Sequence, residues 1–455
     1  MSVTRARIVG AAGSVLLAGS GFAAGALPID PPSWFGDWRA YTLPALLFGY
    51  LGLGLMLAAW WWMRDRADLV TFGIWCLPLA VAPPMFSRDV YSYLAQGAMV
   101  SASLDVYSDG VSRLGGRLAA QVAPMWQDTP TPYGPVFVVI CALVAGVAGT
   151  KLTVGVIGMR LAALAGVGLL AYFVPRLAAR CGADPRSALW LGVLNPLVPL
   201  HLVAGAHNDA LMLGLLVTGL YLAFGQSPRH RFVVATVLVT LAALIKAPAA
   251  AALLVVAARW RSVWRVGAVA ALVTVSVTFL AGTGYGWISS LSTPIYKHSW
   301  SLSSALGRLT RPLLGEASMP FWLWCGLAAL MSVTLIVLWR HQRLGVVYAL
   351  GLGLLALALL GPVTRPWYAL WGLIPIAASA PSAAVRRWCA LFSGVLALLV
   401  LPSGFGPNDP LEVALAAAGV GLAALTLFAF HRPDPVGPPG PHNPQPSGEV
   451  APLGR

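Results

Sequence analysis

Residues 87–97 read Ser87-Arg88-Asp89-Val90-Tyr91-Ser92-Tyr93-Leu94-Ala95-Gln96-Gly97, a polar stretch in a chain that is otherwise mostly apolar. The stretch follows an apolar run that ends at Met85, so it brings a guanidinium and a carboxylate to a predicted membrane boundary. Ionisable groups close to the bilayer are costly and usually have a function. We therefore expect a helix to begin here, outside the membrane, with Asp89 as the candidate catalytic base.

The composition sets the class of protein. Hydrophobic residues make up 58% of the 455 positions and charged residues 10%, with a mean hydropathy of +0.78. A soluble domain would carry about a quarter charged residues. The sequence therefore predicts an all-α polytopic membrane protein. Its five cysteines are scattered and form no C-x-x-C or Cys/His cluster, so we expect no disulfide framework, no metal and no other cofactor.

Apolar runs close to the roughly 20 residues needed to cross a bilayer recur along the whole chain. We assign membrane spans to residues 8–26, 41–63, 69–85, 152–174, 187–203, 210–224, 232–245, 247–258, 263–281, 321–339, 344–360, 367–380, 388–401 and 411–430. The two runs that flank Lys246 could form one broken helix, so the predicted number is 13 or 14. Residues 136–148 are shorter and follow a turn, which predicts an interfacial helix that does not cross.

The formal net charge of +14 predicts the orientation of the chain. With the N-terminus in the cytoplasm, the arginine-rich loops all fall on the inner side: 64–66, 176–186, 229–231, 259–265, 340–343 and 386–387. This distribution follows the positive-inside rule for a protein of the plasma membrane. The loop at 86–135 is then extracytoplasmic. Because the charge is an orientation signal, we expect membrane lipids and no nucleic acid as partners.

The two ends of the chain carry separate signals. Residues 8–26 resemble a signal peptide, but their apolar core is longer than the usual 7–15 residues, so we predict an uncleaved helix. Residues 431–455 are rich in proline and glycine and predict a disordered cytoplasmic tail. Residues 1–430 are predicted to form a single membrane domain, with residues 86–135 as its catalytic loop.

The first outer loop has the densest group of polar and aromatic residues. On a helix that begins at Asp89, the side chains of Tyr93 and Gln96 share a face with the carboxylate. Aspartate is also a favoured N-cap, so a purely structural role for Asp89 is the alternative. Asp105 fits a simple loop turn as well as it fits a functional role.

Later helices place more polar residues on the same predicted side. The sequence His207-Asn208-Asp209 begins a span, where Asn208 or Asp209 would also serve as an N-cap. Lys246 lies deep in an apolar run, where a central lysine costs about 2.5–3.5 kcal/mol unless it snorkels to the interface. Arg365 precedes a tryptophan and a tyrosine, and this group fits either a site or an aromatic belt with a snorkelling cation.

These clusters suit transfer of a sugar from a lipid phosphate. Cations stabilise a departing phosphate, and a carboxylate, Asp89, takes the proton from the attacking hydroxyl. The cations assigned to the phosphate are Lys246, Arg365, His207 and Arg88. The residues assigned to the sugar and the acceptor are Tyr91, Tyr93, Gln96, Asp105, Tyr133, Asn208, Asp209, His298, Trp367 and Tyr368. Trp371 is interpreted as a member of the interfacial belt.

The same residues carry a resemblance to a known family. The strings are Phe86-Ser87-Arg88-Asp89-Val90-Tyr91-Ser92-Tyr93-Leu94-Ala95-Gln96-Gly97, Leu104-Asp105-Val106-Tyr107, Pro132-Tyr133-Gly134-Pro135, Leu194-Asn195-Pro196-Leu197, Gly205-Ala206-His207-Asn208-Asp209, Ile245-Lys246-Ala247 and Pro366-Trp367-Tyr368. In these strings the chain resembles the actinobacterial polyprenyl-phosphomannose-dependent α-1,6-mannosyltransferases of the MptA/MptB type. That family belongs to the C-type (GT-C) superfamily of membrane glycosyltransferases.

The resemblance implies a GT-C-like bundle whose extracytoplasmic first loop carries juxtamembrane helices. It also implies polyprenyl-phosphate-mannose as donor, a lipid-anchored glycan as acceptor, inversion at the anomeric carbon, and Asp89 as the base. Transfer of another sugar from a polyprenyl phosphate, such as arabinofuranose or glucose, is the nearest alternative. A lipid or solute transporter is an alternative of another class, although its polar site would lie near the midplane of the membrane.

Overall fold

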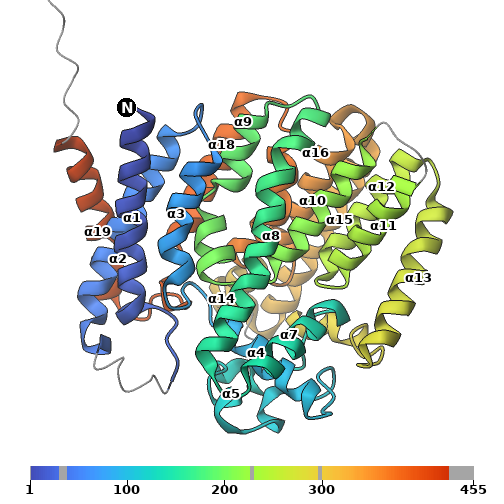
Figure 1. Cartoon of the computed structure of the whole chain (residues 1–455), viewed down its shortest axis with the longest axis horizontal. Coiled ribbons are helices and arrows are strands. Elements are labelled where there is room, and N and C mark those ends of the chain that lie inside the picture. The colour runs from blue at the N-terminus through green and yellow to red at the C-terminus, as the bar shows by residue number, and fades with distance from the viewer. Residues whose placement is uncertain (1, 30–37, 226–229, 296–299, 430–455) are drawn as a thin grey trace, which may run out of the picture.

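The computed structural model describes residues 2–29, 38–225, 230–295 and 300–429. Its long helices stand side by side in a bundle (Figure 1). The bundle helices are α1 (Val3–Ala24), α2 (Thr42–Trp62), α3 (Leu69–Val81), α8 (Leu152–Arg180), α10 (Asp209–Ala223), α11 (His230–Ala243), α12 (Ala252–Trp260), α13 (Val263–Ala281), α15 (Ser318–Leu344), α16 (Val346–Leu360), α17 (Ala369–Ala377), α18 (Ala383–Leu398) and α19 (Pro410–Ala429). The predicted all-α architecture is confirmed for the described residues.

The apolar runs of the sequence coincide with these helices. The run at 263–281 matches α13 at both ends, and the run at 152–174 lies within α8. Six helices in the described part of the chain are long and apolar enough to cross a membrane, or up to seven if a bent pair is one span. The protein is therefore a multi-pass membrane protein, whereas the count of 13 or 14 crossings stays a prediction.

The first loop folds into short helices at the end of the bundle opposite to the N-terminus (Figure 1). These are α4 (Asp89–Ser101), η3 (Val111–Arg113), α5 (Gly116–Ala120), α6 (Pro124–Gln127) and α7 (Pro135–Ala148), of which α7 matches the short run predicted at 136–148. A Cβ on Gly97 of α4 would lie 2.1 Å from the carbonyl oxygen of Cys141 in α7, so glycine allows the two helices to touch. The remaining short elements are η2 (Trp38–Tyr41), α9 (Pro185–Ala188), η4 (Leu189–Val193), η5 (Val198–Ala204), η6 (Ala247–Ala251), η7 (Ser289–Ile295), α14 (Leu302–Leu314), η8 (Gly315–Ala317) and η9 (Pro366–Tyr368).

The predicted span at 187–203 is broken in its middle. The segments Pro185–Val193 and Val198–Ala204 are bent by 57° relative to each other. Pro196 lies at the break and has no backbone N–H to continue a helix. The Oδ1 of Asn195 accepts the N–H of Leu197 at 3.1 Å, so a side chain satisfies a backbone donor that the break leaves without a helical partner.

A second break lies at Lys246, between α11 and η6, and the first loop docks onto it. The N–H of Gly134 donates to the carbonyl of Ile245 at 3.4 Å, and the N–H of Val136 donates to that of Leu244 at 3.2 Å. Carbonyls at the end of a helix have no partner within the helix, so the loop supplies one. A Cβ on Gly134 would lie 2.2 Å from the oxygen of Leu244, so this approach requires glycine.

A buried arginine ties together two helix ends near the first loop. The guanidinium of Arg160, in α8, donates to the carbonyls of Ala82 at 2.6 Å and Ala204 at 3.0 Å. These residues lie at the ends of α3 and η5, where helix carbonyls favour a cation. The chain continues from these two ends to Asp89 and to His207, so Arg160 fixes the approach of both segments.

Two of the predictions lie outside the described residues. The proline- and glycine-rich tail at 431–455 is one, and His298 is the other.

Candidate active site

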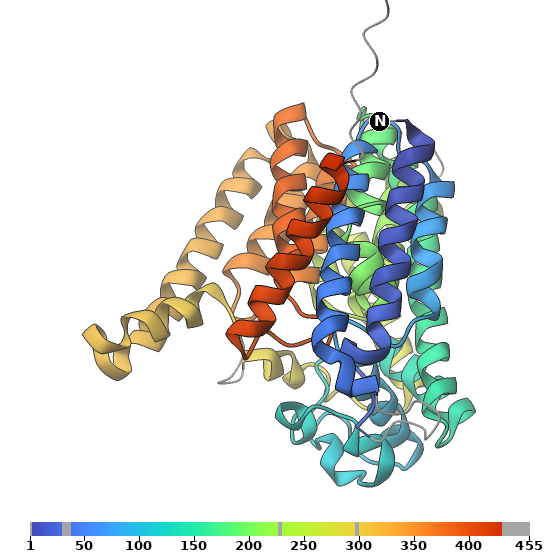
Figure 2. The same ribbon diagram turned by 90° about the vertical axis from the view of Figure 1, so that its left-hand side faces the viewer.

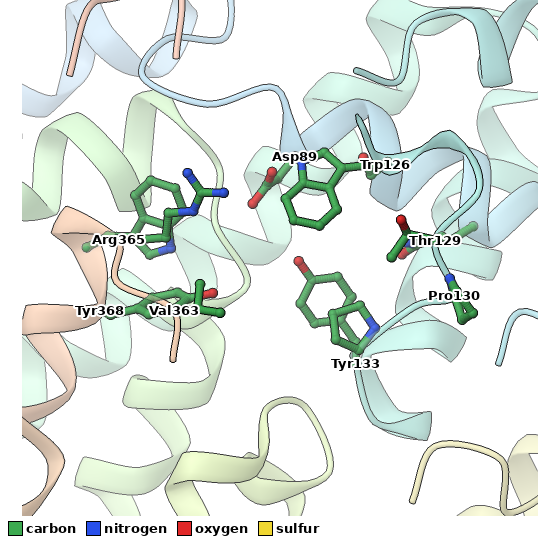
Figure 3. A pocket seen from close by; sticks show the side chains of 12 residues that line it. Asp89, Trp126, Thr129, Pro130, Tyr133, Val363, Arg365 and Tyr368 are labelled. Carbon is green, nitrogen blue, oxygen red and sulfur yellow. The ribbon is translucent and has the colours of Figure 1, made fainter. Parts of the chain in front are cut away.

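A pocket opens between the first loop and the chain that leads into α17 (Figure 3). One face of α4 lines it, together with the segments 126–133 and 363–368. The lining residues are Asp89, Ser92, Gln96, Trp126, Thr129, Pro130, Pro132, Tyr133, Val363, Arg365, Trp367 and Tyr368. The pocket thus brings together six of the residues predicted from the sequence, namely Asp89, Gln96, Tyr133, Arg365, Trp367 and Tyr368.

Asp89 is the first residue of α4, and Arg88 takes the N-cap position without a side-chain capping bond. No backbone N–H of α4 is paired with the Asp89 carboxylate among the described residues. The Asp89 side chain is 29% exposed, and its Oδ2 lies 3.5 Å from Nδ1 of His207. The alternative that Asp89 only caps the helix does not fit these contacts.

The surroundings of Asp89 affect its protonation. Burial raises the pKa of the Asp89 carboxyl above its usual range, while the positive charges of Arg365 and Lys246 act in the opposite direction. The rate of proton abstraction by a carboxylate benefits from a pKa closer to the operating pH. The local environment therefore suits Asp89 to general-base chemistry.

The face of α4 that carries Asp89 is joined to the segment 126–133. Gln96 lies two turns further along the helix, and its Oε1 accepts a hydrogen bond from the Thr131 hydroxyl at 3.1 Å. The Tyr133 ring packs edge-on against Tyr93 at 5.4 Å and against Phe137 at 5.3 Å. These contacts fix the position of the segment 126–133 relative to α4.

Arg365 supplies a guanidinium to the pocket. Figure 3 shows this group facing the Asp89 carboxylate, with the Tyr133 hydroxyl directed toward the carboxylate from below. The Cζ of Arg365 lies 6.0 Å from the centre of the Trp126 ring. A cation, a carboxylate and aromatic rings around one space can together bind a phosphate and a sugar.

Lys246 lies behind this lining and is bound to Asp209. Its Nζ is 2.8 Å and 3.0 Å from the two carboxylate oxygens, and the indole N–H of Trp371 donates to Asp209 Oδ1 at 2.6 Å. The Lys246 Nζ also lies 4.5 Å from the centre of the Tyr368 ring. The prediction that Trp371 belongs to an interfacial belt is wrong, because this side chain is buried and hydrogen-bonded to a carboxylate.

Other residues assigned to the substrate lie away from the pocket. Arg88 donates to the backbone carbonyls of Leu27 at 2.8 Å and Gln121 at 3.2 Å. The Tyr91 hydroxyl donates to a carbonyl just after α1 at 2.7 Å. Asp105 accepts the backbone N–H two residues further along at 2.9 Å, as in an Asx turn. These contacts favour a structural role for all three.

Tyr93, His207 and Asn208 are buried and do not line the pocket. The Tyr93 hydroxyl lies 3.4 Å from Nδ1 of His207. Asn208 takes the N-cap position of α10 without a side-chain capping bond.

Six lining residues were not assigned to the substrate from the sequence, namely Ser92, Trp126, Thr129, Pro130, Pro132 and Val363. Ser92 follows Asp89 by three positions on a helix, so helical spacing alone could have identified it. Trp126 and Thr129 come from a loop whose path no periodicity predicts. Only the folded chain brings them to Asp89.

A multi-pass helical bundle with a carboxylate, a guanidinium and aromatic rings around one pocket is the arrangement expected of a membrane glycosyltransferase. The model of the alpha-(1->6)-mannopyranosyltransferase N-terminal domain matches residues 7–262, and that of the MptB C-terminal domain matches residues 304–429. The chain belongs to the MptA/MptB family of alpha-(1->6)-mannopyranosyltransferases and is a mannosyltransferase.

Curated relatives agree over most of the chain. An alpha-(1->6)-mannopyranosyltransferase of Mycobacterium tuberculosis is 32% identical over 90% of this chain and 83% of its own length. Alpha-(1->6)-mannopyranosyltransferase A of the same organism is 31% identical over 85% of this chain and 82% of its own. Alpha-(1->6)-mannopyranosyltransferase B of Corynebacterium glutamicum is 28% identical over 93% and 81%. No solved structure matches the chain.

Proposed function

We propose that this mannosyltransferase takes mannose from polyprenyl-phosphate-mannose and adds it, with inversion, to a lipid-anchored mannan through an α-(1→6) bond. One observation carries the proposal: Asp89 and Arg365 face each other in a pocket at one end of a membrane bundle (Figure 3). A lipid phosphate and a hydrophilic acceptor can both reach such a place. The names of the relatives support mannose and the α-(1→6) linkage.

Asp89 is the proposed base. Its carboxylate takes the proton from the acceptor hydroxyl as that oxygen attacks the anomeric carbon, while the bond from this carbon to the phosphate oxygen breaks. Phosphate is a good leaving group, so one carboxylate suffices and no separate acid is needed. Arg365 stabilises the negative charge that builds on the phosphate. The rings of Trp126 and Tyr133 offer faces on which sugar rings stack.

In this proposal Lys246 does not contact the substrate but supports a residue that lines the pocket. Its ammonium is held by Asp209 and lies against the ring of Tyr368, which lines the pocket. The Asp209 carboxylate balances this charge, so the pair supports the wall of the pocket and is not itself a phosphate ligand. Arg365 is therefore the group in direct contact with the phosphate.

The substitution Asp89→Asn tests the base, because it keeps the shape of the side chain and removes its basicity. We expect the variant to fold and to lose about 10²–10⁴-fold in kcat. Turnover is measured with purified protein, polyprenyl-phosphate-mannose and a mannan acceptor. Asp109→Asn is the matched control, because Asp109 lies in the same loop and pairs with Arg113 at 3.4 Å, outside the pocket. Near-normal turnover in Asp89→Asn would remove it as the base.

A donor panel tests the sugar. Purified protein is incubated in parallel with polyprenyl-phosphate mannose, arabinofuranose and glucose, and the product mass is determined. We expect transfer of mannose at the highest rate. A higher rate with either of the other two donors would replace mannose in the proposal.

We place the active site on the extracytoplasmic face. The arginine-rich loop between α8 and α9 lies at the end of the bundle opposite to the first loop, which supports this orientation through the positive-inside rule (Figure 1). In a background without native cysteines, we expect a cysteine at Ser112 to react with an impermeant reagent on intact cells, and one at Ala183 to stay unlabelled. Labelling at Ala183 would reverse the orientation.

A further inference from the structure

Two residues far apart in the chain meet beneath the pocket. The Oδ2 of Asp89 lies 3.5 Å from Nδ1 of His207, and the His207 side chain is fully buried while that of Asp89 is 29% exposed. His207 does not line the pocket, so it contacts the carboxylate from the side away from the substrate space. His207 can therefore act on the Asp89 carboxylate, but it does not reach the phosphate.

The direction of the His207 ring is set by its packing. The ring stacks on Trp367 at 4.0 Å with an interplanar angle of 26°, and the ring of His201 lies 6.2 Å away. The Tyr93 hydroxyl is 3.4 Å from the same Nδ1 that faces Asp89, whereas Nε2 is buried without a hydrogen-bond partner among the described residues. A ring clamped in this way offers Nδ1 to the carboxylate.

The backbone next to both residues is unusual. Phe86, three positions before Asp89, has a φ of 63°, and Ala206, directly before His207, has a φ of 50°. Positive φ is costly for residues other than glycine, and such strain gathers at functional sites. The N–H of Met85 also bonds the carbonyl of Ala204 at 3.3 Å, which joins the two segments just ahead of the pair.

The charge state of His207 favours donation to Asp89. Burial lowers the pKa of His207 well below its usual range, and the nearby charges of His201, Lys246 and Arg365 add to this. The neutral ring carries a single proton, and Nδ1 is the ring nitrogen that faces an anionic acceptor. A hydrogen bond to the ionised carboxylate favours the charged form and opposes the effect of burial on Asp89.

We propose that His207 is the positioning residue of the base: its Nδ1–H holds Oδ2 of Asp89, so that Oδ1 faces the acceptor hydroxyl. The inference rests on the proposed role of Asp89 and goes beyond it. Contacts of this kind are often long in the empty enzyme and tighten when substrate binds. In the reaction the proton passes from the acceptor hydroxyl to Asp89, and His207 stays neutral throughout.

The role of His207 can be tested through the pH profile of the enzyme. Activity is lost as the pH falls through the pKa of the base, because a protonated carboxyl cannot accept a proton. Removing the donor raises the pKa of Asp89, so the acidic limb of kcat/KM moves to higher pH by about one unit. The titratable and charged groups that face the pair from the surrounding elements stay in place: Tyr93, Tyr133, His201, Asp209, Lys246, Arg365 and Tyr368.

The experiment compares the pH profiles of purified variants. His207→Phe keeps the stack on Trp367 and removes the donor, and His207→Leu removes it without a ring, so both should show the upward shift of about one pH unit. His207→Asn keeps an N–H donor and should keep the limb near that of the unchanged protein. Tyr93→Phe removes the other contact of Nδ1 and is the matched control, with an unshifted limb. The unfolding temperature in detergent shows which variants are folded.

Two outcomes would overturn the inference. An acidic limb that stays in place in the folded Phe or Leu variant, with kcat lowered equally at every pH, would give His207 a structural role only. A higher KM for the donor without a shifted limb would assign His207 to the phosphate. Near-normal activity in Asp89→Asn is a different result, because it removes the base itself and with it the proposed function.

Discussion

The strongly apolar helices of this protein are buried to very different extents. Helices α1 and α8 form a buried group, whereas α13, α14, α15 and α19 form an exposed group. Half of the most apolar stretch of α1 is buried, and 44% of that of α8. The values are 11% for α13 and α19 and 6% for the pair α14–α15, which stands out to one side in Figure 2. Hydropathy therefore predicts that a helix prefers lipid to water, but not whether protein or lipid covers it.

Close contacts at glycine accompany the burial of α1. A Cβ on Gly13 of α1 would lie 2.5 Å from the carbonyl oxygen of Gly52 in α2, so glycine lets these helices touch. At Gly267, in the exposed helix α13, no atom lies within 4 Å of the added Cβ. Membrane helices associate through close packing, because lipid offers no hydrophobic drive between them. Tightly packed helices can hold charged groups in fixed places, and the site is built on them.

The largest stability effect should come from the ion pair behind the pocket. Asp209→Asn leaves the Lys246 ammonium, 11% exposed, without its counter-ion in the interior of the bundle. We expect the free energy of unfolding to fall by about 3–5 kcal/mol. Thermal unfolding in detergent measures it, and adding Lys246→Met should restore most of the loss. An unchanged midpoint in Asp209→Asn would show that water reaches this pair.

The next effect concerns the arginine that joins two helix ends. Arg160→Met leaves the carbonyls of Ala82 and Ala204 without a donor, and we expect a loss of about 2–3 kcal/mol. Turnover should fall as well, because the segments that carry Asp89 and His207 are no longer held together by hydrogen bonds to one guanidinium. Arg160→Lys keeps the charge without the branched donor geometry, so we expect an intermediate loss in both measurements. Full activity in both variants would contradict this role.

Two glycines in α8 allow the effect of close packing on stability to be measured within one helix. A Cβ on Gly166 of α8 would lie 2.3 Å from the backbone of Ala210, whereas nothing lies within 4 Å of one on Gly168. We expect Gly166→Ala to cost about 1–3 kcal/mol. Gly168→Ala should leave stability unchanged or raise it by up to about 1 kcal/mol, since alanine favours the helix. Equal effects of the two substitutions, measured by thermal unfolding, would disprove close packing as the cause.

The smallest effect should come from the exposed group of helices. Leu335 in α15 is 59% exposed, so Leu335→Ala removes few contacts within the protein. We expect a change within about 0.5 kcal/mol and unaltered turnover. A loss of more than about 1 kcal/mol would mean that another surface covers α15 in the native protein.

The positions of the helices could be predicted from the sequence. In lipid the backbone N–H and C=O groups of a spanning segment must be hydrogen-bonded within the segment. Each long apolar run is therefore expected to form a helix. Local spacing also placed Gln96 on the face of Asp89, and both line the pocket. The roles assigned to these residues stay predictions until turnover is measured, and so does the number of crossings.

Only the tertiary structure decided which polar groups meet. Lys246 pairs with Asp209, 37 positions away, and Trp371 joins them from 162 positions away. Arg88, next to Asp89 in the sequence, turns away to backbone carbonyls. A polar side chain in a membrane protein takes the partner that packing brings to it, because the desolvated group must be satisfied. Sequence spacing determines the faces of helices, while the choice among distant partners is made by the way those helices pack.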